Sequence, residues 1–476
     1  MKFNNKNYLW NSVDLEKITN GNSSAYWECK GIEIDSRKVR KGDLFFPLPG
    51  KKLDGHNFIK EAIARGAEAT LIKKGFEENN SEFNNVIVED VLESLYRLAK
   101  ESRTRAKKLY DTNFVAITGS SGKSSTKEIM RKACNSVVNA YANPDSYNNH
   151  IGVPYSLANI PRHTNCAILE LGMNNFDEIK KLSILIKPFI SIITNISSAH
   201  IGNFNSIQDI VKAKSEIFYG MDKSGFAILN RDQKFYKFIR DIASKEGIKN
   251  IITFGENKNS DVYLRSRKIL NVGQALEVSV FGKTYIFEIN LDGAHQAQNC
   301  LSVIAALKVM DYDMEKALIG LSNIDLLSGR GIKHKIYINN QESWLIDDTY
   351  NANPSSVEAS LKSLKELSKG NRNVLVIGDM RELGNFSKEL HETIANLIIK
   401  LNTTLVFCVG YETQVIYKTI KNDSQAYWFK EISEMKKENY IDLLEPSDFI
   451  LIKGSRAMKM EKLVKYTINN FNNKDL

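Results

Sequence analysis

The stretch NFVAITGSSGKSSTKE, residues 113–128, decides the fold class of this sequence. Its apolar, β-branched run Phe114–Thr118 is typical of a buried strand. The small residues 119–122 then predict a tight loop, and the residues from Lys123 onward predict a helix. A strand, a small-residue loop and a helix N-terminus in this order form an anion site, because the loop N–H groups point inward and the helix dipole favours negative charge.

The glycine and lysine spacing in this stretch indicates a nucleotide-binding loop of the shorter kind, G-x-x-G-K-S. The common longer pattern needs a glycine at position 117, where this chain has Ile117. In such a loop Lys123 would bind the β- and γ-phosphates, and the hydroxyl of Ser124 would bind Mg²⁺. A Gly-Ser turn before an ordinary helix is the alternative, but the strand before it and the helix after it favour ATP and Mg²⁺. The predicted loop consists of Gly119, Ser120, Ser121, Gly122, Lys123, Ser124 and Ser125.

Length and composition are those of an ordinary globular protein. The 476 residues suggest about three domains, and 42% hydrophobic with 25% charged residues is enough to bury real cores. The polar N-terminus and the lack of any run near 18 apolar residues favour neither a signal peptide nor a membrane span. The five cysteines are scattered and show no CxxC spacing, which favours reduced thiols in the cytoplasm.

The net charge of +9 is spread along the chain. The densest basic cluster, residues 103–108 (RTRAKK), is shorter than a nucleic-acid patch and is not interleaved with aromatic residues. We therefore interpret it as a solvated linker or helix surface and expect no nucleic-acid partner. A basic balance also suits an enzyme whose substrates are nucleotides.

Strands alternate with helical stretches along the chain, which predicts the α/β class in three domains. We expect a small N-terminal α/β domain (1–110), a central parallel-sheet domain built around the phosphate loop (111–325), and a C-terminal Rossmann-like α/β domain (326–476). Residues 262–291 break the alternation and predict a small antiparallel insert. The Gly-rich turn at 328–331 is suited to a hinge before the third domain.

Polar residues follow several predicted strands. Glu170 ends a CAIL strand, and a carboxylate there would point into the crevice where α/β proteins bind ligands, so we favour Mg²⁺ over a salt-bridged strand end. His200 follows the next strand, where a ligand role and a structural role are equally open. Lys214 lies on an amphipathic stretch where lysines are solvated by default. Ser36 and Arg37 could hold a phosphate, although a surface ion pair of Arg37 with Asp35 is favoured by composition alone.

Motifs in all three domains resemble the Mur ligase family, the ATP-dependent amino-acid ligases of peptidoglycan precursor synthesis. The resemblance covers essentially the whole chain. GSSGKSS (119–125) is similar to that family's shortened phosphate loop, and DSRKVRKGDLFF (35–46) to its UDP-sugar-binding segment. The segments most similar to the member that adds D-alanyl-D-alanine are NNHIGVP (148–154), ELGMN (170–174), DDTYNANPSS (347–356) and GDMRELG (378–384).

The resemblance implies a reaction. ATP would phosphorylate the terminal carboxylate of UDP-N-acetylmuramoyl-tripeptide, and the amine of D-alanyl-D-alanine would then displace the phosphate. Two anions must be brought together, so catalysis would consist mostly of positioning and charge neutralisation. We expect a cytoplasmic monomer without a nucleic-acid or membrane partner, whose third domain closes over ATP.

The resemblance also implies roles for individual residues. Lys123, Lys214 and His200 would be catalytic, with Lys214 carbamylated, and Mg²⁺ would be held by Ser124, Glu170, His200 and Lys214. Adenine would contact Asn299, a phosphate Arg330 and the ribose Asp348. The substrate-binding residues would be Ser36, Arg37, Asn148, Asn149, Asn351 and Asn353. The family often has His-Asn where this chain has His295-Gln296, and Ser124 replaces a commoner threonine.

Other functions are weighed against this one. A sister ligase could add the third amino acid, or glutamate to folate, but DSR argues against folate, and NANPSS with MRELG argues against the third-residue ligase. A P-loop NTPase motor would need a Walker-type aspartate and oligomer contacts. A binding protein without catalysis is disfavoured, because Lys123, Ser124 and Glu170 retain working chemistry.

Overall fold

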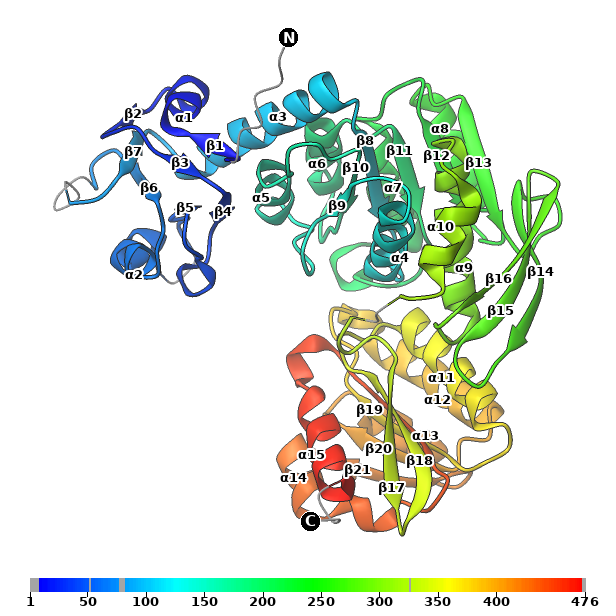
Figure 1. Ribbon diagram of the computed structural model, residues 1–476. Helices are drawn as coiled ribbons and strands as arrows, with labels where there is room; N and C mark the ends of the chain where they lie inside the picture. Colours follow the sequence, from blue (N-terminus) through cyan, green and yellow to red (C-terminus); the bar gives the residue numbers. More distant parts are fainter. Residues whose placement is uncertain (1–7, 51–52, 77–81, 325–326, 473–476) are drawn as a thin grey trace.

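The computed structural model describes residues 8–50, 53–76, 82–324 and 327–472. It is an α/β protein with three main sheets, one in each of three units that follow one another along the chain (Figure 1), so the predicted fold class is confirmed. The N-terminal and C-terminal units both adjoin the central one. The polar N-terminal residues 1–7 and the predicted domain boundary at 325/326 lie outside the described residues.

The N-terminal unit contains a five-stranded sheet of order β2-β7-β6-β5-β4, in which only β2 is antiparallel to its neighbour. Its strands are β2 (Asn22–Ser23), β4 (Gly31–Glu33), β5 (Asp43–Phe45), β6 (Ala69–Lys73) and β7 (Asn85–Val88), beside a two-stranded pair of β1 (Trp10–Asn11) and β3 (Glu28–Cys29). Its helices are α1 (Ser12–Thr19), α2 (Ile59–Ala64) and α3 (Val91–Tyr110).

Helix α3 joins this unit to the central one and carries the basic cluster. Two of its arginines are not solvated as the sequence suggested. Arg105 lies 4.2 Å above the ring of Trp10 and donates to the carbonyl of Leu9, and burial lowers its pKa to about 10. Arg103 covers the ring of Phe114 and donates to the carbonyl of Ile186. By stacking and hydrogen bonding, Arg105 therefore fastens α3 within the N-terminal unit, and Arg103 fastens it to the central unit.

The central unit is a nine-stranded sheet of order β16-β15-β14-β13-β12-β11-β8-β10-β9. Its strands are β8 (Asn113–Thr118), β9 (Ala140–Ala142), β10 (Cys166–Glu170), β11 (Ile190–Ile193), β12 (Phe226–Asn230), β13 (Asn250–Gly255), β14 (Val262–Ile269), β15 (Gln274–Val280) and β16 (Lys283–Ile289). Its helices are α4 (Lys123–Asn135), α5 (Gly152–Ala158), α6 (Glu178–Ile186), α7 (Ile207–Ser215), α8 (Tyr236–Lys245), α9 (Ala294–Val309) and α10 (Met314–Leu321). The predicted antiparallel insert is β14–β16, which extends the same sheet because β14 pairs in parallel with β13.

Strand β8 shows why this sheet is buried on both faces. Phe114 and Ala116 belong to the core on one face, and Val115 and Ile117 to the core on the other. Successive side chains of a strand alternate between faces, so an unbroken apolar run is expected when helices cover both. The phosphate loop therefore emerges from a strand that packing holds rigidly.

The C-terminal unit is a six-stranded sheet of order β17-β18-β22-β19-β20-β21, parallel except for the edge strand β17. Its strands are β17 (Ile332–Ile338), β18 (Gln341–Asp348), β19 (Asn373–Gly378), β20 (Leu405–Val409), β21 (Gln425–Phe429) and β22 (Phe449–Lys453). Its helices are α11 (Pro354–Ser368), α12 (Ser387–Lys400), α13 (Gln414–Ile420), α14 (Ile432–Lys437) and α15 (Glu461–Asn472). No helix in the described part of the chain is both long enough and apolar enough to cross a bilayer.

Candidate active site

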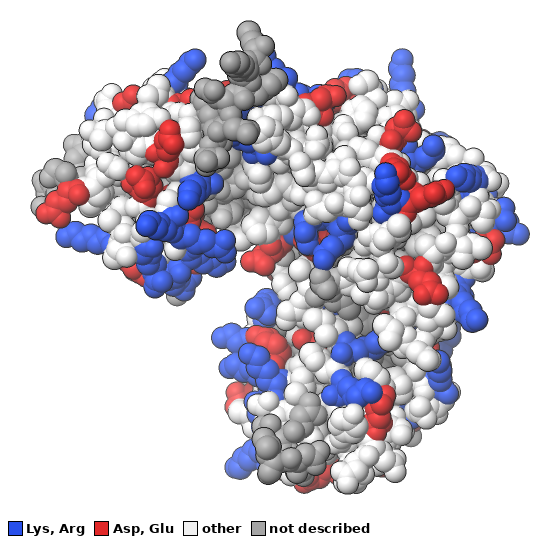
Figure 2. Space-filling model, viewed as in Figure 1, with Lys and Arg blue, Asp and Glu red and all other residues white. Residues whose placement is uncertain are grey.

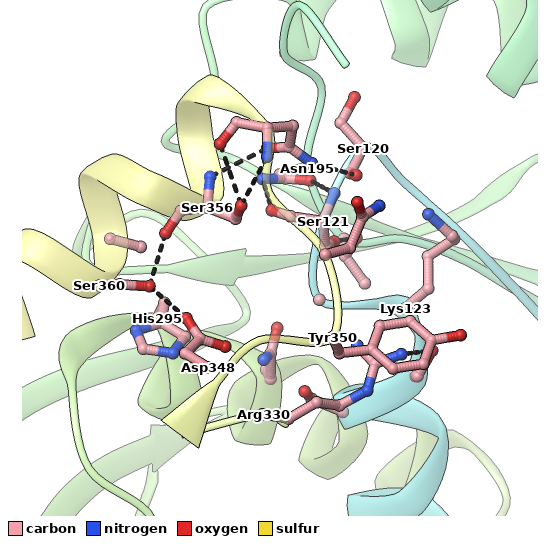
Figure 3. A pocket seen from close by; sticks show the side chains of 18 of the residues that line it. Ser120, Ser121, Lys123, Asn195, His295, Arg330, Asp348, Tyr350, Ser356 and Ser360 are labelled. Carbon is pink, nitrogen blue, oxygen red and sulfur yellow. Dashed lines mark hydrogen bonds between the residues drawn. The ribbon is translucent and has the colours of Figure 1, made fainter. Parts of the chain in front are cut away.

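A cavity of about 520 Å³ lies where the central and C-terminal units meet (Figure 3). The loop after β8 lines it from one side, and residues around Arg330, Asp348 and the start of α11 line it from the other. The carboxyl ends of parallel strands are where α/β proteins place ligands, and this cavity lies at that edge.

Two glycines of the phosphate loop are required by its geometry. Gly119 has φ +152°, and a Cβ on it would lie 1.9 Å from Oγ1 of Thr194. Gly122 has φ +80°, and its Cβ would lie 2.7 Å from Oδ1 of Asn299. Any larger residue would also have to displace the side chain of Thr194, just after β11, or that of Asn299 on α9. Gly122 also caps α4, so Lys123, Ser124 and Ser125 form the first turn of that helix.

The sequence did not reveal Asn195, which holds the phosphate loop from the end of β11. Its backbone carbonyl accepts from the N–H of Ser120 at 2.9 Å, and its side-chain oxygen accepts from the N–H of Ser121 at 2.8 Å. The sequence suggested that the N–H groups of the loop point inward. The N–H groups of Ser120 and Ser121 instead donate to Asn195. The first-turn N–H groups of α4, which have no acceptor within the helix, remain available to an anion instead.

Lys123 is held at the cavity by a hydrogen bond from its Nζ to the carbonyl of Gly119 at 2.7 Å. Burial lowers its pKa, and the nearby carboxylate of Glu170 opposes that shift. A half-buried ammonium group with one internal acceptor keeps donors for a phosphate.

Ser124 and Glu170 form the centre of the site. The hydroxyl of Ser124 donates to Oε2 of Glu170 at 2.5 Å, and the amide of Asn148 donates to Oε1 at 2.7 Å. Arg330, from the C-terminal unit, donates to Oγ of Ser124 at 2.9 Å. The third unit therefore reaches the phosphate loop directly, and its guanidinium stacks 3.9 Å from the ring of Tyr350.

Behind Glu170 lies a buried lysine that the motif reading missed. Lys127 is fully buried, and its Nζ donates to the carbonyls of Asn143 and Asp145 at 2.6 and 2.7 Å. Oδ1 of Asn143 in turn accepts the backbone N–H of Glu170 at 2.9 Å. The lysine thus holds the loop that orients the carboxylate. The sequence feature that could have indicated Lys127 is its position, one helical turn after Lys123 in α4.

The opposite end of the cavity carries a second polar group (Figure 3). Oδ2 of Asp348 accepts from Ser360 and from Lys453, both at 2.6 Å. Asn299 donates to the side chain of Gln296 at 3.0 Å, so the glutamine that departs from the family pattern orients Asn299. The capping residue of α11 is Asn353, with Ser356 as its reciprocal partner.

Comparisons with known proteins agree with this geometry. Three family models match in order: "Mur ligase family, catalytic domain" over residues 28–107, "Mur ligase middle domain" over 117–307 and "Mur ligase, glutamate ligase domain" over 336–456. A Rickettsia prowazekii protein named UDP-N-acetylmuramoyl-tripeptide--D-alanyl-D-alanine ligase is 36% identical over 96% of this chain and 99% of its own length. This chain belongs to the Mur ligase family. Proteins of the same name from Bacillus subtilis and Escherichia coli are each 28% identical and cover more than nine-tenths of it.

Solved structures place the Mur ligase fold over the same length. A crystal structure of MurF from Acinetobacter baumannii has a TM-score of 0.83 and 27% identity, covering 97% of this chain and 99% of that one. MurF from Thermotoga maritima in complex with ADP has a TM-score of 0.78 at 23% identity, covering 93% and 98%, and supports the fold. The three-domain architecture expected from the family is therefore confirmed.

The structure brings most of the predicted site residues of this Mur ligase to one cavity, but not all of them. Ser36 and Arg37 lie in the N-terminal unit, outside the cavity lining. Ser36 is buried and donates to Glu61, whereas Arg37 makes an exposed two-bond pair with Asp35, as composition had favoured. Exposed basic residues gather in this turn, and Figure 2 shows a basic group on that edge of the unit, beside the hollow between the units.

The two remaining predicted residues differ in placement. His200 lines the cavity, and its Nδ1 lies 2.6 Å from Oε2 of Glu382 in the C-terminal unit, which lowers the pKa of that carboxyl. Lys214 is fully buried below the cavity lining. Burial and the charge of Lys123 lower the pKa of Lys214 well below its usual value.

The donors of this Mur ligase fit Mg²⁺. Ser124 and Glu170 offer oxygen atoms at the end of the phosphate loop, and Mg²⁺ is bound in proteins by one or two carboxylates together with substrate phosphates. Among the described residues, no group of three or more His, Cys, Asp or Glu side chains is arranged as a closed metal cage. A shared protein–phosphate site is the arrangement that such a donor set supports.

Proposed function

We propose that this protein joins D-alanyl-D-alanine to UDP-N-acetylmuramoyl-tripeptide at the expense of ATP, giving UDP-N-acetylmuramoyl-pentapeptide, ADP and phosphate. One observation carries the proposal: Arg330 of the C-terminal unit hydrogen-bonds Ser124 of the phosphate loop. A ligase of this family must bring together the nucleotide, which one unit binds, and the substrates, which the other two units bind. The full-length identity to ligases of that name supports the choice of substrates.

The first step is transfer of the γ-phosphoryl group. An oxygen of the tripeptide's terminal carboxylate attacks the γ-phosphorus, the bond to the bridging oxygen breaks, and ADP leaves. Lys123 and the first-turn N–H groups of α4 bind the phosphates and reduce the repulsion between the two anions. Arg330 adds a second cation from the other side of the cavity.

Mg²⁺, held by Ser124 and Glu170, would neutralise phosphate charge in that step. Asn148 and the Lys127–Asn143 link keep the carboxylate of Glu170 aimed at the cavity. We propose His200 and a carbamylated Lys214 as further metal ligands. Their support is the cavity position of His200 and the burial of Lys214, which favours the neutral amine that reacts with CO₂.

In the second step the amine of the dipeptide attacks the acyl carbon and phosphate leaves, while the amine loses a proton. We assign Asn351, Asn353 and the loop 378–384 to the dipeptide side of the cavity, and Asn148 and Asn149 to the tripeptide side. Asn299 is assigned to adenine and Asp348 to the ribose. The assignments of the asparagines and of Asp348 rest on the family resemblance and on the cavity lining. The assignment of the loop 378–384 rests on the resemblance alone.

The UDP end of the substrate is assigned to Ser36 and Arg37 in the N-terminal unit. The exposed basic turn at 37–41 supports this role. A diphosphate is bound by cationic side chains, and those of this turn are already accessible to it. Arg37 would exchange Asp35 for the diphosphate. We further propose that the protein acts as a cytoplasmic monomer without nucleic-acid or membrane partners, for which its five buried free thiols are suited.

Phosphate release from ATP tests the reaction. The purified protein is assayed with UDP-N-acetylmuramoyl-tripeptide and D-alanyl-D-alanine, and each substrate is omitted in turn. Release that needs both is expected, and Lys123→Ala should lower it about 10²- to 10³-fold, as for other groups that stabilise transition-state charge. Lys108→Ala, at an exposed lysine of α3, is the matched control. Release without the dipeptide, or stimulated by one amino acid or by nucleic acid, would favour a sister ligase or a motor instead.

Lys214 is tested separately by the mass of the intact protein. In bicarbonate buffer under native conditions, we expect the wild-type protein to carry one added carboxyl group. Lys214→Met should lack it, since the thioether has no nitrogen to modify. A wild-type mass that equals the sequence mass in bicarbonate would contradict the carbamate.

A further inference from the structure

The central and C-terminal units meet a second time at a contact between two short turns. One is the turn at His200, followed by the 3₁₀ segment Ile201–Asn203, and the other runs from Glu382 into the segment Gly384–Phe386. Nδ1 of His200 lies 2.6 Å from Oε2 of Glu382. The backbone N–H of Gly202 donates to the carbonyl of Glu382 at 3.1 Å. We call this pairing the turn contact.

Glycine is required on both sides of the turn contact. A Cβ on Gly202 would lie 2.7 Å from the nitrogen of Gly384 and 2.9 Å from the oxygen of Glu382. A Cβ on Gly384 would lie 2.8 Å from Cα of Gly202. Two backbones this close form a fitted contact, because any side chain at either position would force the turns apart.

The backbone at both ends of the ion pair is in the left-handed region. His200 has φ +63° and Glu382 has φ +66°. For residues with a Cβ this conformation is strained, and it persists where the surroundings enforce it. Here the apolar neighbours Ile201 on one side and Leu383 on the other belong to one continuous buried cluster.

The contact between His200 and Glu382 by itself would contribute little stability. The side chain of Glu382 is 56% exposed, and pairs that solvent reaches contribute little to folding. The direction of the Nδ1–Oε2 contact also departs from that of a good hydrogen bond. The contact is therefore better explained by an effect on the orientation of the imidazole than by a contribution to folding stability.

We infer that Glu382 is a positioning residue that fixes the ring of His200 when the C-terminal unit closes on the central one. With Nδ1 facing the carboxylate, Nε2 is the nitrogen left for the cavity that His200 lines. A carboxylate on one imidazole nitrogen fixes the ring orientation for a metal at the other. The inference rests on the proposed function. It implies that His200 is oriented as a metal ligand only when the two units are closed.

Two substitutions separate the parts of the turn contact. Glu382→Gln removes the charge but keeps the backbone carbonyl that Gly202 uses, and Glu382→Ala removes the whole side chain. Gly202→Ala instead prevents docking, because its Cβ meets Gly384. Glu342→Gln, at an exposed ion pair in the same unit, is the matched control.

The first readout is the Mg²⁺ concentration that gives half the maximal ligation rate. For Glu382→Ala and Gly202→Ala we expect it to rise, and kcat to fall, by about 10- to 100-fold, the range seen for groups that orient metal ligands. Glu382→Gln should fall between these variants and the wild type, because its side chain keeps the size of glutamate beside Nδ1 but not the charge. All parameters of Glu342→Gln should stay unchanged.

The second readout does not use activity. Hydrogen exchange of the peptide that contains Gly202 should be slow in the wild type and in Glu382→Gln, and fast in Gly202→Ala. Normal Mg²⁺ dependence in both Glu382 variants would overturn the inference, even if Gly202→Ala were impaired or unfolded. A wild-type protein without dipeptide-dependent phosphate release would instead overturn the proposed function, so the two failures are distinguishable.

Discussion

Lys127 shows how much of this site depends on a residue that touches no substrate. Its buried ammonium donates to two carbonyls of the loop 143–148, and that loop binds both the backbone and the carboxylate of Glu170. Burial lowers the pKa of Lys127, and the carboxylate of Glu170 opposes that shift. The lysine thus acts through the orientation of Glu170, which we propose as a metal ligand.

Replacing this lysine should disturb both folding and catalysis. Lys127→Met keeps the volume but leaves the carbonyls of Asn143 and Asp145 without their donor, which should cost about 1–3 kcal/mol of unfolding free energy. Urea unfolding and the phosphate-release assay measure the two effects. Lys108→Met on the surface of α3 is the control, and an unfolding midpoint of Lys127→Met equal to that control would contradict the role.

Asp448 is predicted to make stability depend on pH. The side chain is fully buried, and burial raises its pKa from 3.8 to about 6 although Arg372 opposes the shift. Between about pH 4 and pH 6 the folded chain holds a proton that the unfolded chain has released, so stability falls as pH rises through this window. Urea midpoints of Asp448→Asn should lack this slope. An equal slope in both proteins would refute the assignment.

The sequence could predict the residues that act within a motif or at a strand end. Lys123 and Ser124 follow from the loop pattern, and Glu170 from its place after a buried strand. It could not predict Asn195, whose hydrogen bond to Ser121 spans 74 positions. The segment GDMRELG, which contains Glu382, stood out in the sequence. Its pairing with His200 was equally hidden, because a contact across two domains leaves no local pattern.

At the scale of elements, the start of α11 couples helix stability to the nucleotide site. Asn353 caps the helix through the N–H of Ser356 at 2.9 Å, and its amide donates to the carbonyl of Ser120 in the phosphate loop at 3.3 Å. The helix also carries Ser360, which binds Asp348. One side chain therefore sets the helix start and touches the loop.

Asn353→Ala should lower stability by about 1 kcal/mol, the usual cost of losing a cap, and raise KM for ATP. Asp313→Ala is a matched control, because Asp313 caps α10, outside the cavity lining. Both variants should lose similar stability in urea unfolding, and only Asn353→Ala should bind ATP more weakly. Equal KM values in the two variants would show that the contact with Ser120 has no role.

The sequence carries most of the element pattern, and its omissions are instructive. The strands from β8 to β13 follow from apolar runs that helices bury on both faces. The sequence-based expectations give only a linker or a helix surface at 103–108 and do not delimit helix α3, although Val91, Leu95 and Leu98 recur at helical spacing in its buried stripe. The basic residues near its end were interpreted by their charge alone. The stacking of Arg105 on Trp10 could not be predicted, because the two residues are far apart in the sequence.

At the scale of the whole molecule, the arrangement of the units depends on contacts that no motif encodes. Besides the turn contact, the C-terminal unit is held to the insert of the central unit by Arg267 on β14 and Glu366 on α11. The guanidinium donates to both carboxylate oxygens, at 3.0 and 2.6 Å, and the two side chains are 17% and 32% exposed. Arg267 also donates to Gln274, which fixes its direction.

This two-bond pair should control how far the units close. Arg267→Glu places two carboxylates together, and the repulsion should favour the open arrangement by about 1 kcal/mol or more, a factor of about five in population. Small-angle scattering should then give a larger radius of gyration than the wild type has, with or without nucleotide and substrate. The double variant Arg267→Glu/Glu366→Arg restores opposite charges and should recover the smaller radius and the ligation rate. Lys335→Glu, at an ion pair within one hairpin, should change neither. Equal radii in all these proteins would mean that closure does not depend on the insert, and that the turn contact and the contacts of Arg330 and Asn353 with the phosphate loop hold the units together.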